Sequence, residues 1–250
     1  MSKRFEGKVV VVTGASKGIG AAIAKQFASE GASVVVNYAT SKEGADRVVA
    51  EIKKNGGKAV AVQADMAKKS DVGRLFEEAK KAFGRLDVLV NNAGIYEFAP
   101  LDTINEENFH KQFDINVLGL IFASQEAAKY FGPEGGSIVN ISSIASTLTP
   151  PASTVYSGTK AAVDATTRVL AKELGPKKIR VNAVNPGMVD TEGWRAAGIG
   201  ESEWRKVVES QTPLGRLGVP QDIAPAVAFF ASPEASWITG ETLTIAGGFR

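Results

Sequence analysis

The sequence predicts an α/β protein with a doubly wound parallel sheet of about seven strands and helices on both faces. Short apolar runs rich in valine alternate with longer stretches in which apolar residues recur every three or four positions. Continuous apolar runs are typical of strands buried on both faces of a parallel sheet, and the second period is typical of amphipathic helices. Their regular alternation indicates right-handed βαβ units. A glycine cluster directly after the first run is a third sign, because such folds bind phosphate groups at that position.

Six apolar runs have the length and composition expected of buried strands. They consist mainly of valine, with alanine, isoleucine, leucine and two asparagines. No run is assigned to the seventh strand. The six cover residues 9–12, 34–36, 59–62, 88–90, 138–141 and 181–184.

Three helices are predicted between the first four strands. Ile19, Ile23 and Phe27 recur at four-residue spacing, and Gly31 follows as a stop. The second helix ends near residues 55–57 and the third at Gly84. The apolar stripe of the second helix is Val48, Val49 and Ile52. That of the third helix is Val72, Leu75, Phe76, Ala79 and Phe83.

The least regular stretch runs from about residue 190 to 217, after the sixth strand. It is rich in glycine and contains Trp194 and Pro213. Long irregular segments at this position often cover a substrate site. A substrate lid and an ordinary pair of surface helices both fit the sequence. No linker or internal repeat divides the chain, so we expect residues 1–250 to form one domain for cofactor binding and catalysis.

Composition excludes several classes of function. The 250 residues carry 29 basic and 27 acidic side chains, a net charge of +2 that gives no argument for nucleic acid or an anionic membrane as partner. There is no cysteine and a single histidine, His110, which we expect at the surface. Disulfides, thiolate chemistry and a His/Cys metal site are thereby ruled out, and no metal is predicted. With neither a signal peptide nor a membrane-spanning run visible, we expect a soluble, cytoplasmic protein.

The glycine cluster is Gly14, Gly18 and Gly20, between the first strand and the first helix. A tight turn there brings backbone amides to a helix N-terminus, where the amides and the helix dipole suit a pyrophosphate. The spacing G-x-x-x-G-x-G differs from the G-x-G-x-x-G fingerprint of many dinucleotide sites. Glycines at strand–helix turns can also be purely structural, and here the flanking strand and helix favour the phosphate site.

The end of the second strand bears on which dinucleotide would bind. An acidic residue there commonly binds the adenosine ribose and favours NAD. This strand ends at Asn37, which carries no charge to repel a 2′-phosphate, and Lys17, Ser41 and Lys42 could neutralise or hydrogen-bond one. The sequence therefore favours NADP(H), with NAD(H) still possible.

Tyr156 and Lys160 form the main catalytic signal. Four residues apart, they share one face of a helix, and the cation should lower the pKa of the phenol from its usual value of about 10. A tyrosine tuned in this way can donate or accept a proton. Ser143 lies thirteen residues before Tyr156. Together with the glycine cluster, these residues indicate a nicotinamide cofactor that moves hydride while Tyr156 moves the proton.

Over essentially its whole length the chain resembles the short-chain dehydrogenase/reductase family, whose single domain has a Rossmann-type fold. The resemblance rests on the order and spacing of several motifs. They are the T-G-x-x-x-G-x-G loop at residues 13–20, the N-N-A-G segment at 91–94, Ser143, the Y-x-x-x-K pair, and Pro186-Gly187 with Thr191 beyond.

The resemblance implies a role for each site residue. Tyr156 would be the acid/base, Ser143 would polarise the substrate carbonyl, and Lys160 would hold the nicotinamide ribose and lower the Tyr156 pKa. Asn116 would support a water-linked proton relay to Lys160, and Asn91 would tie strands together. The expected cofactor-binding residues are Gly14, Ser16, Lys17, Gly18, Ile19, Gly20, Asn37, Ser41, Asp65, Met66, Asn92, Ala93, Gly94, Tyr156, Lys160, Pro186, Gly187, Val189 and Thr191.

Positions expected to face the substrate are mostly apolar, which favours a hydrophobic ketone or aldehyde. The exceptions are Glu97 and Arg195. The apolar positions are Ile95, Tyr96, Phe98, Ile144, Leu148, Val155, Met188 and Trp194.

Several alternatives stay open beside an NADPH-preferring carbonyl reductase. One is a 3-oxoacyl-carrier-protein reductase, although Glu134 supplies an acid where a base would help to bind an acidic carrier. A glucose-dehydrogenase-like sugar dehydrogenase is another. A non-catalytic NADP-binding sensor or scaffold is less favoured, because it would need none of the catalytic residues. The resemblance also implies a homotetramer.

Overall fold

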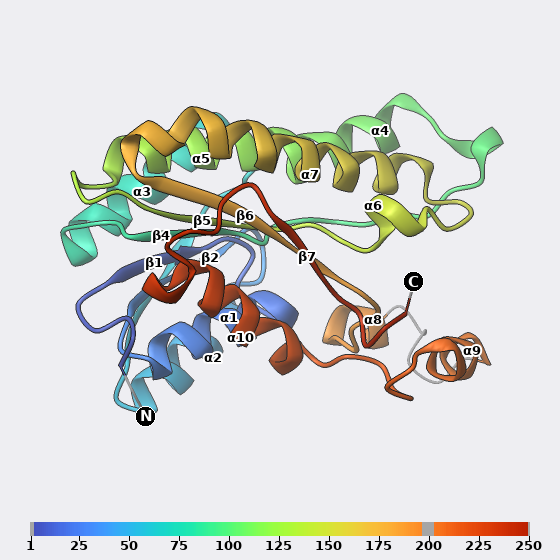
Figure 1. The fold of residues 1–250 in the computed structure, drawn as a ribbon, viewed down its shortest axis with the longest axis horizontal. Helices are drawn as coiled ribbons and strands as arrows, with labels where there is room; N and C mark the ends of the chain where they lie inside the picture. The colour runs from blue at the N-terminus through green and yellow to red at the C-terminus, as the bar shows by residue number, and fades with distance from the viewer. Residues whose placement is uncertain (1–2, 197–202, 250) are drawn as a thin grey trace.

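The seven strands of the structure form one parallel sheet in the order β3-β2-β1-β4-β5-β6-β7 (Figure 1). The structure is a computed structural model that describes residues 3–196 and 203–249. It confirms the predicted fold class, and each of the six predicted runs lies in a strand. The strands are β1 Val9–Val12, β2 Ser33–Tyr38, β3 Lys58–Gln63, β4 Val88–Asn91, β5 Gly136–Ile141, β6 Ile179–Pro186 and β7 Thr242–Ile245.

Helices cover both faces of this sheet. Helices α1, α2 and α10 lie on one face, and α3, α5 and α7 on the other (Figure 1). None of the described helices combines the length and the apolar character needed to cross a membrane. The helices are α1 Gly18–Ser29, α2 Lys42–Lys54, α3 Lys69–Phe83, α4 Glu106–Phe113, α5 Gly119–Tyr130, α6 Ala145–Leu148, α7 Thr154–Leu174, α8 Glu192–Ala196, α9 Glu203–Gln211 and α10 Pro220–Ala231.

The strand order reverses at β1, which pairs with β2 on one side and β4 on the other. Val12 is in register with both Val36 and Val90, so the carboxyl ends of these three strands are level. In open α/β sheets ligands bind outside the carboxyl ends of the strands at such a reversal. The glycine loop after β1 and the segment after β4 therefore meet at the expected binding position.

The predicted apolar stripe of α1 packs into the core and so holds this helix directly after the glycine loop. Ile23 and Phe27 are fully buried, and the Phe27 ring packs edge-on against Phe5 with centroids 4.8 Å apart. Phe27 also belongs to the core cluster formed by β1, β2 and α10.

Replacing Phe27 with alanine should therefore lower the free energy of unfolding by about 3–5 kcal/mol, the usual loss for a fully buried aromatic ring. Urea denaturation followed by circular dichroism would measure it. The matched control is Leu101→Ala, because Leu101 is 78% exposed and the change there should stay within about 0.5 kcal/mol. Equal losses in both variants would contradict this view of the core.

Candidate active site

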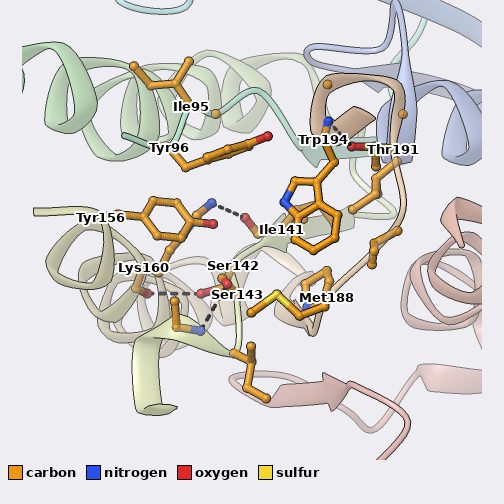
Figure 2. Close-up of a pocket in the computed structure, with 18 of the residues that line it drawn as sticks. Ile95, Tyr96, Ile141, Ser142, Ser143, Tyr156, Lys160, Met188, Thr191 and Trp194 are labelled. Atoms are coloured by element: carbon orange, nitrogen blue, oxygen red, sulfur yellow. Dashed lines mark hydrogen bonds between the residues drawn. The ribbon is translucent and has the colours of Figure 1, made fainter. Parts of the chain in front are cut away.

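A cavity of about 640 Å³ opens at the carboxyl ends of the strands and brings most of the predicted site residues together (Figure 2). Ser143, Tyr156 and Lys160 line it. Of the predicted cofactor residues, the same wall includes Lys17, Gly18, Ile19, Gly20, Asn92, Gly94, Pro186, Gly187, Val189 and Thr191.

The predicted substrate positions line the other part of the cavity, with two exceptions. Val155 is buried but does not line it, and Arg195 does not line it either, its guanidinium being paired with Asp190 at 3.0 Å. Glu97 lines the rim together with Lys111, with which it forms an ion pair. The positions that do line the cavity are Ile95, Tyr96, Phe98, Ile144, Leu148, Met188 and Trp194.

The Tyr156 phenol and the Lys160 ammonium both come from α7, one turn apart. Lys160 Nζ lies 5.7 Å from the centroid of the Tyr156 ring and donates a hydrogen bond to Ile141 O at 3.0 Å. Tyr96 and Phe98 contact the same ring, with centroids 6.2 and 6.0 Å away. Ser143 follows β5, and its Oγ accepts a hydrogen bond from Ala145 N at 3.1 Å.

The pKa of Tyr156 differs in direction from the sequence prediction. Burial raises the pKa of Tyr156, and its hydrogen bond with Ser143 opposes that rise. Burial also lowers the pKa of Lys160 to about 8, while the carboxylate of Asp164 opposes that fall. Desolvation of the buried phenol is the largest cause of the shift, and it opposes the lowering that the spacing of Tyr156 and Lys160 predicts.

Asn116 lies behind the cavity in a π-helical turn, Asp114–Leu118, that separates α4 from α5. Such turns often occur at functional sites. Its Oδ1 accepts from Ile95 N and its Nδ2 donates to Ile95 O, both at 2.8 Å, and to Thr159 Oγ1 at 3.1 Å. A Cβ atom at Gly94 would lie 3.2 Å from Asn116 Oδ1 and 3.6 Å from Lys160 Nζ. The two predicted relay residues thus flank Gly94.

The glycine loop is bonded to the segment after β4. Asn92 Nδ2 donates to Thr13 O at 2.8 Å and to Gly14 O at 3.0 Å, and Thr13 Oγ1 accepts from the amides of Asn92 and Ala93. A Cβ atom on Gly20 would come within 2.4 Å of Asn92 Nδ2 and 2.5 Å of Gly14 O, so no side chain fits there. This close approach fixes the glycine loop at the start of α1, where helix N-terminal amides can bind a phosphate group.

Asn91 has the structural role that the sequence predicts. Its Nδ2 donates to Asn140 Oδ1 on β5 at 2.9 Å and to Ser124 Oγ at 3.2 Å.

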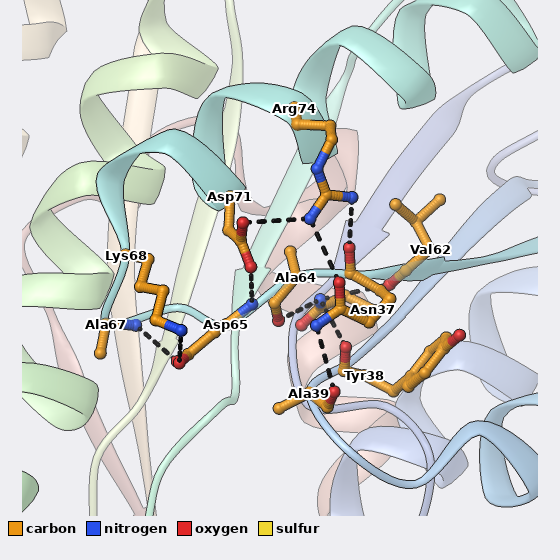
Figure 3. A network of polar contacts seen from close by, with 11 residues as sticks. Asn37, Tyr38, Ala39, Val62, Ala64, Asp65, Ala67, Lys68, Asp71 and Arg74 are labelled. Carbon is orange, nitrogen blue, oxygen red and sulfur yellow. Dashed lines mark hydrogen bonds and ion pairs between the residues drawn. The ribbon is translucent and has the colours of Figure 1, made fainter.

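Asn37 joins the glycine loop to the end of β3, and Figure 3 shows its contacts with Val62 and Ala64. It is buried, its Oδ1 accepts from Gly14 N at 3.0 Å, and its Nδ2 donates to Ala64 O at 3.1 Å and Val62 O at 3.3 Å. The sequence indicates only that Asn37 carries no charge, and no local pattern predicts these bonds. The neighbouring Asp65, predicted to meet the adenine ring, accepts from Ala67 N.

The basic side chains predicted near a 2′-phosphate differ in availability. Lys42 Nζ is bonded to Asp46 at 2.6 Å, next to Ser41 at the start of α2. Lys17 is exposed and immediately precedes α1, and within residues 3–196 and 203–249 no ion pair involves it. Lys17 is therefore the more available cation.

The predicted lid is described in part, since residues 197–202 fall outside the described residues. Trp194 on α8 lines the cavity and packs against Val208 of α9 and Leu217. Glu192 on α8 also accepts a hydrogen bond from Gly18 N at 2.9 Å, a contact that no sequence motif predicts. The described parts of this segment therefore form a wall of the cavity, and whether it acts as a lid stays a prediction.

The contacts of Asn37 predict the effect of replacing it with aspartate. The carboxylate would still accept from Gly14 N, but its second oxygen would face the carbonyl oxygens of Val62 and Ala64. The free energy of unfolding should fall by about 1–3 kcal/mol, as it does when a buried polar group loses its partner. Asn105→Asp is the control in the same denaturation assay, because that exposed helix cap needs only an acceptor. Equal stability of both variants would contradict the assigned role of Asn37.

Comparisons with known proteins agree with this geometry. The family model described as Enoyl-(Acyl carrier protein) reductase matches residues 14–250. An uncharacterised oxidoreductase of Methylorubrum extorquens is 58% identical over 250 residues, the full length of both chains. A hydroxynaphthalene reductase-like protein of Metarhizium guizhouense is 42% identical over 98% of this chain and 96% of its own.

A solved structure extends the likeness to three dimensions. The short-chain dehydrogenase of Burkholderia cenocepacia in complex with NADP is 41% identical, covers 98% of each chain, and superposes with a TM-score of 0.91. With the sheet order, the glycine loop and the Tyr156–Lys160 pair in place, the chain belongs to the short-chain dehydrogenase/reductase family and is an oxidoreductase of that family.

Proposed function

We propose that the protein is an NADPH-preferring carbonyl reductase that interconverts a hydrophobic ketone or aldehyde and its alcohol. The observation that carries the proposal is that Ser143 and Tyr156 line the same cavity, which also contains the first turn of α1. A carbonyl oxygen at this pair would meet two donors.

The residues of the chain divide the work of reduction between them. A bound nicotinamide dinucleotide supplies the hydride. Ser143 Oγ and Tyr156 Oη stabilise the negative charge that grows on the substrate oxygen, and Tyr156 gives that oxygen its proton. The raised pKa of Tyr156 keeps the phenol protonated near neutral pH, as a proton donor must be.

Lys160 would restore the proton. Its ammonium is buried beside the Tyr156 ring with a pKa of about 8, close enough to neutral for reversible transfer. Asn116, on the other side of Gly94, would hold the water that links this proton to solvent. The same ammonium would bind the ribose hydroxyls of the cofactor.

The polar groups around the start of α1 support a dinucleotide that carries a 2′-phosphate. The amides at the start of α1 suit the pyrophosphate, Asn37 brings no negative charge, and Lys17 offers an exposed cation beside them. The homologous Burkholderia cenocepacia structure is a complex with NADP.

The residues that line the cavity favour an apolar and preferably aromatic substrate. Tyr96, Phe98 and Trp194 present ring faces and edges to it, and Met188 adds a polarisable sulfur. A relative is named as hydroxynaphthalene reductase-like, which fits an aromatic carbonyl compound. Sugars would find few hydrogen-bonding partners on this wall.

Tyr156→Phe should lower kcat for carbonyl reduction at least about a hundredfold, because the proton donor is lost, while the Kd for NADPH stays within about twofold. NADPH oxidation would be followed against aromatic ketones, aliphatic ketones, aldehydes, glucose and a 3-oxoacyl thioester. Tyr130→Phe is the matched control, since Tyr130 stacks on Phe76 in the core cluster below α5. Tight NADPH binding without turnover of any of these carbonyls would favour the sensor or scaffold function instead.

Lys17→Met should weaken NADPH binding about tenfold and leave NADH binding nearly unchanged, because a hydrogen bond to a charged group contributes roughly 1.5 kcal/mol. Fluorescence titration with each dinucleotide would measure both dissociation constants. The control is Lys58→Met at the start of β3, where the lysine is exposed. A loss of the same size for NADH and NADPH would contradict a role of Lys17 at the 2′-phosphate.

A further inference from the structure

Helix α7 carries a buried carboxylate that the proposed chemistry does not use. Asp164 is 7% exposed and lies one helical turn beyond Lys160. Its Oδ1 and Oδ2 accept from Asn185 Nδ2 at 3.2 and 3.0 Å. In the described part of the chain no ion pair within 4.0 Å involves Asp164. A carboxylate buried in this way is stable only if some positive charge or set of donors compensates it.

The opposite charge lies on the same face of α7. Residues four apart on a helix are neighbours, and Lys160 is 6% exposed with its ammonium bonded to Ile141 O. The titratable groups around it are Tyr156 and Asp164 on its own helix and Tyr96 beyond Tyr156. The packed elements present neutral side chains to this region: Asn116 from the π-helical turn, Ser142 and Ser143 after β5, and Asn185 from β6.

Asn185 connects the carboxylate to the turn that carries Ser143. Besides Asp164, its Nδ2 reaches Ser143 O at 3.3 Å and Ser146 Oγ at 3.2 Å. Its Oδ1 is buried and has no hydrogen-bond partner. With its own Oδ1 unsatisfied, Asn185 directs its Nδ2 donor at the Asp164 carboxyl group.

We propose that Asp164 is a positioning residue whose carboxylate, held by Asn185, is the counter-charge that keeps the buried Lys160 ammonium protonated. Asp164 lies one turn farther along α7 than Lys160 and acts only through it. The task of Lys160 in proton transfer rests on the proposed function, but the charge pairing does not. The pairing also explains why two ionisable groups are retained in the packed region between α7 and β6.

The direction of the Lys160 shift agrees with this pairing. Burial lowers the pKa of Lys160 to about 8, and Asp164 opposes the fall. Without the carboxylate the pKa of Lys160 would fall further, so a larger share of Lys160 would be neutral at pH 7. The folded variant then binds fewer protons than the unfolded chain near neutral pH. Its loss of stability relative to the unchanged protein disappears once the pH exceeds about 8, the pKa of Lys160 with Asp164 in place.

Asp164→Asn removes the charge with little change of shape. The new amide can also donate to the unsatisfied Asn185 Oδ1, so the packing between α7 and β6 should survive. The matched control is Glu173→Gln, which removes an exposed carboxylate from the same helix. The set is completed by Lys160→Met and by the double variant of Asp164→Asn and Lys160→Met.

The experiment measures the thermal unfolding midpoint of each protein at pH 7 and at about pH 9.5, above the Lys160 pKa of about 8. Asp164→Asn should lower the midpoint at neutral pH and lower it much less at alkaline pH. In the Lys160→Met background this pH-dependent loss should vanish, which isolates the coupling between the two residues. Glu173→Gln should show no such pattern. Because no turnover is needed, a failure of the proposed reductase activity leaves this result interpretable.

A loss of equal size at both pH values, or an undiminished pH-dependent loss in the Lys160→Met background, would overturn the proposal and make Asp164 a structural anchor of β6. If Asp164→Asn does not fold, the double variant decides. If the double variant folds, the pairing is supported. If the double variant does not fold although Lys160→Met alone does, the pairing is overturned. In an active enzyme, Asp164→Asn should also move the alkaline limb of the kcat–pH profile of carbonyl reduction to lower pH, and an unmoved limb would count against the pairing.

Discussion

The site depends on the contact between the glycine loop and the segment that follows β4. Thr13, Gly14 and Gly20 approach Asn92 so closely that a single methyl group at Gly20 would break the contact. The approach is possible because β1 pairs with both β2 and β4 at the point where the strand order reverses. The glycine loop lies on one side of this junction. On the other side, Gly94 lies between Asn116 and Lys160. The proposed cofactor site and the proposed proton-transfer groups thus depend on the same junction.

The sequence was sufficient for most of the fold because its strands are nearly uniform. The four valines of β1 are buried on both faces of the sheet, and β4 and β5 repeat that pattern. The seventh strand escaped assignment because Thr242–Ile245 is largely exposed and has no continuous apolar run. An edge strand with one covered face and alternating threonines carries too weak a pattern to separate it from a loop. Assembly as a homotetramer stays a prediction.

The site was predictable where motifs have fixed spacing and unpredictable where contacts join distant segments. The four-residue spacing of Tyr156 and Lys160 placed both in one cavity. The direction of the Tyr156 pKa could not be predicted in this way, because it depends on burial beneath Tyr96 and Phe98 rather than on helix spacing. Nor could the bonds of Asn37 to Ala64 and of Asn185 to Asp164 on α7, which join segments far apart in the sequence and have no local signature.

The hydrogen bond from Gly18 N to Glu192 joins the start of α1 to α8, 174 positions away along the chain. An incoming phosphate would seek the same region of positive backbone potential, so it competes with an anion that belongs to the protein. Trp194, two residues farther on in the same short helix, also lines the cavity. A phosphate that displaced Glu192 from Gly18 N would therefore remove the hydrogen bond that joins α8 to the start of α1.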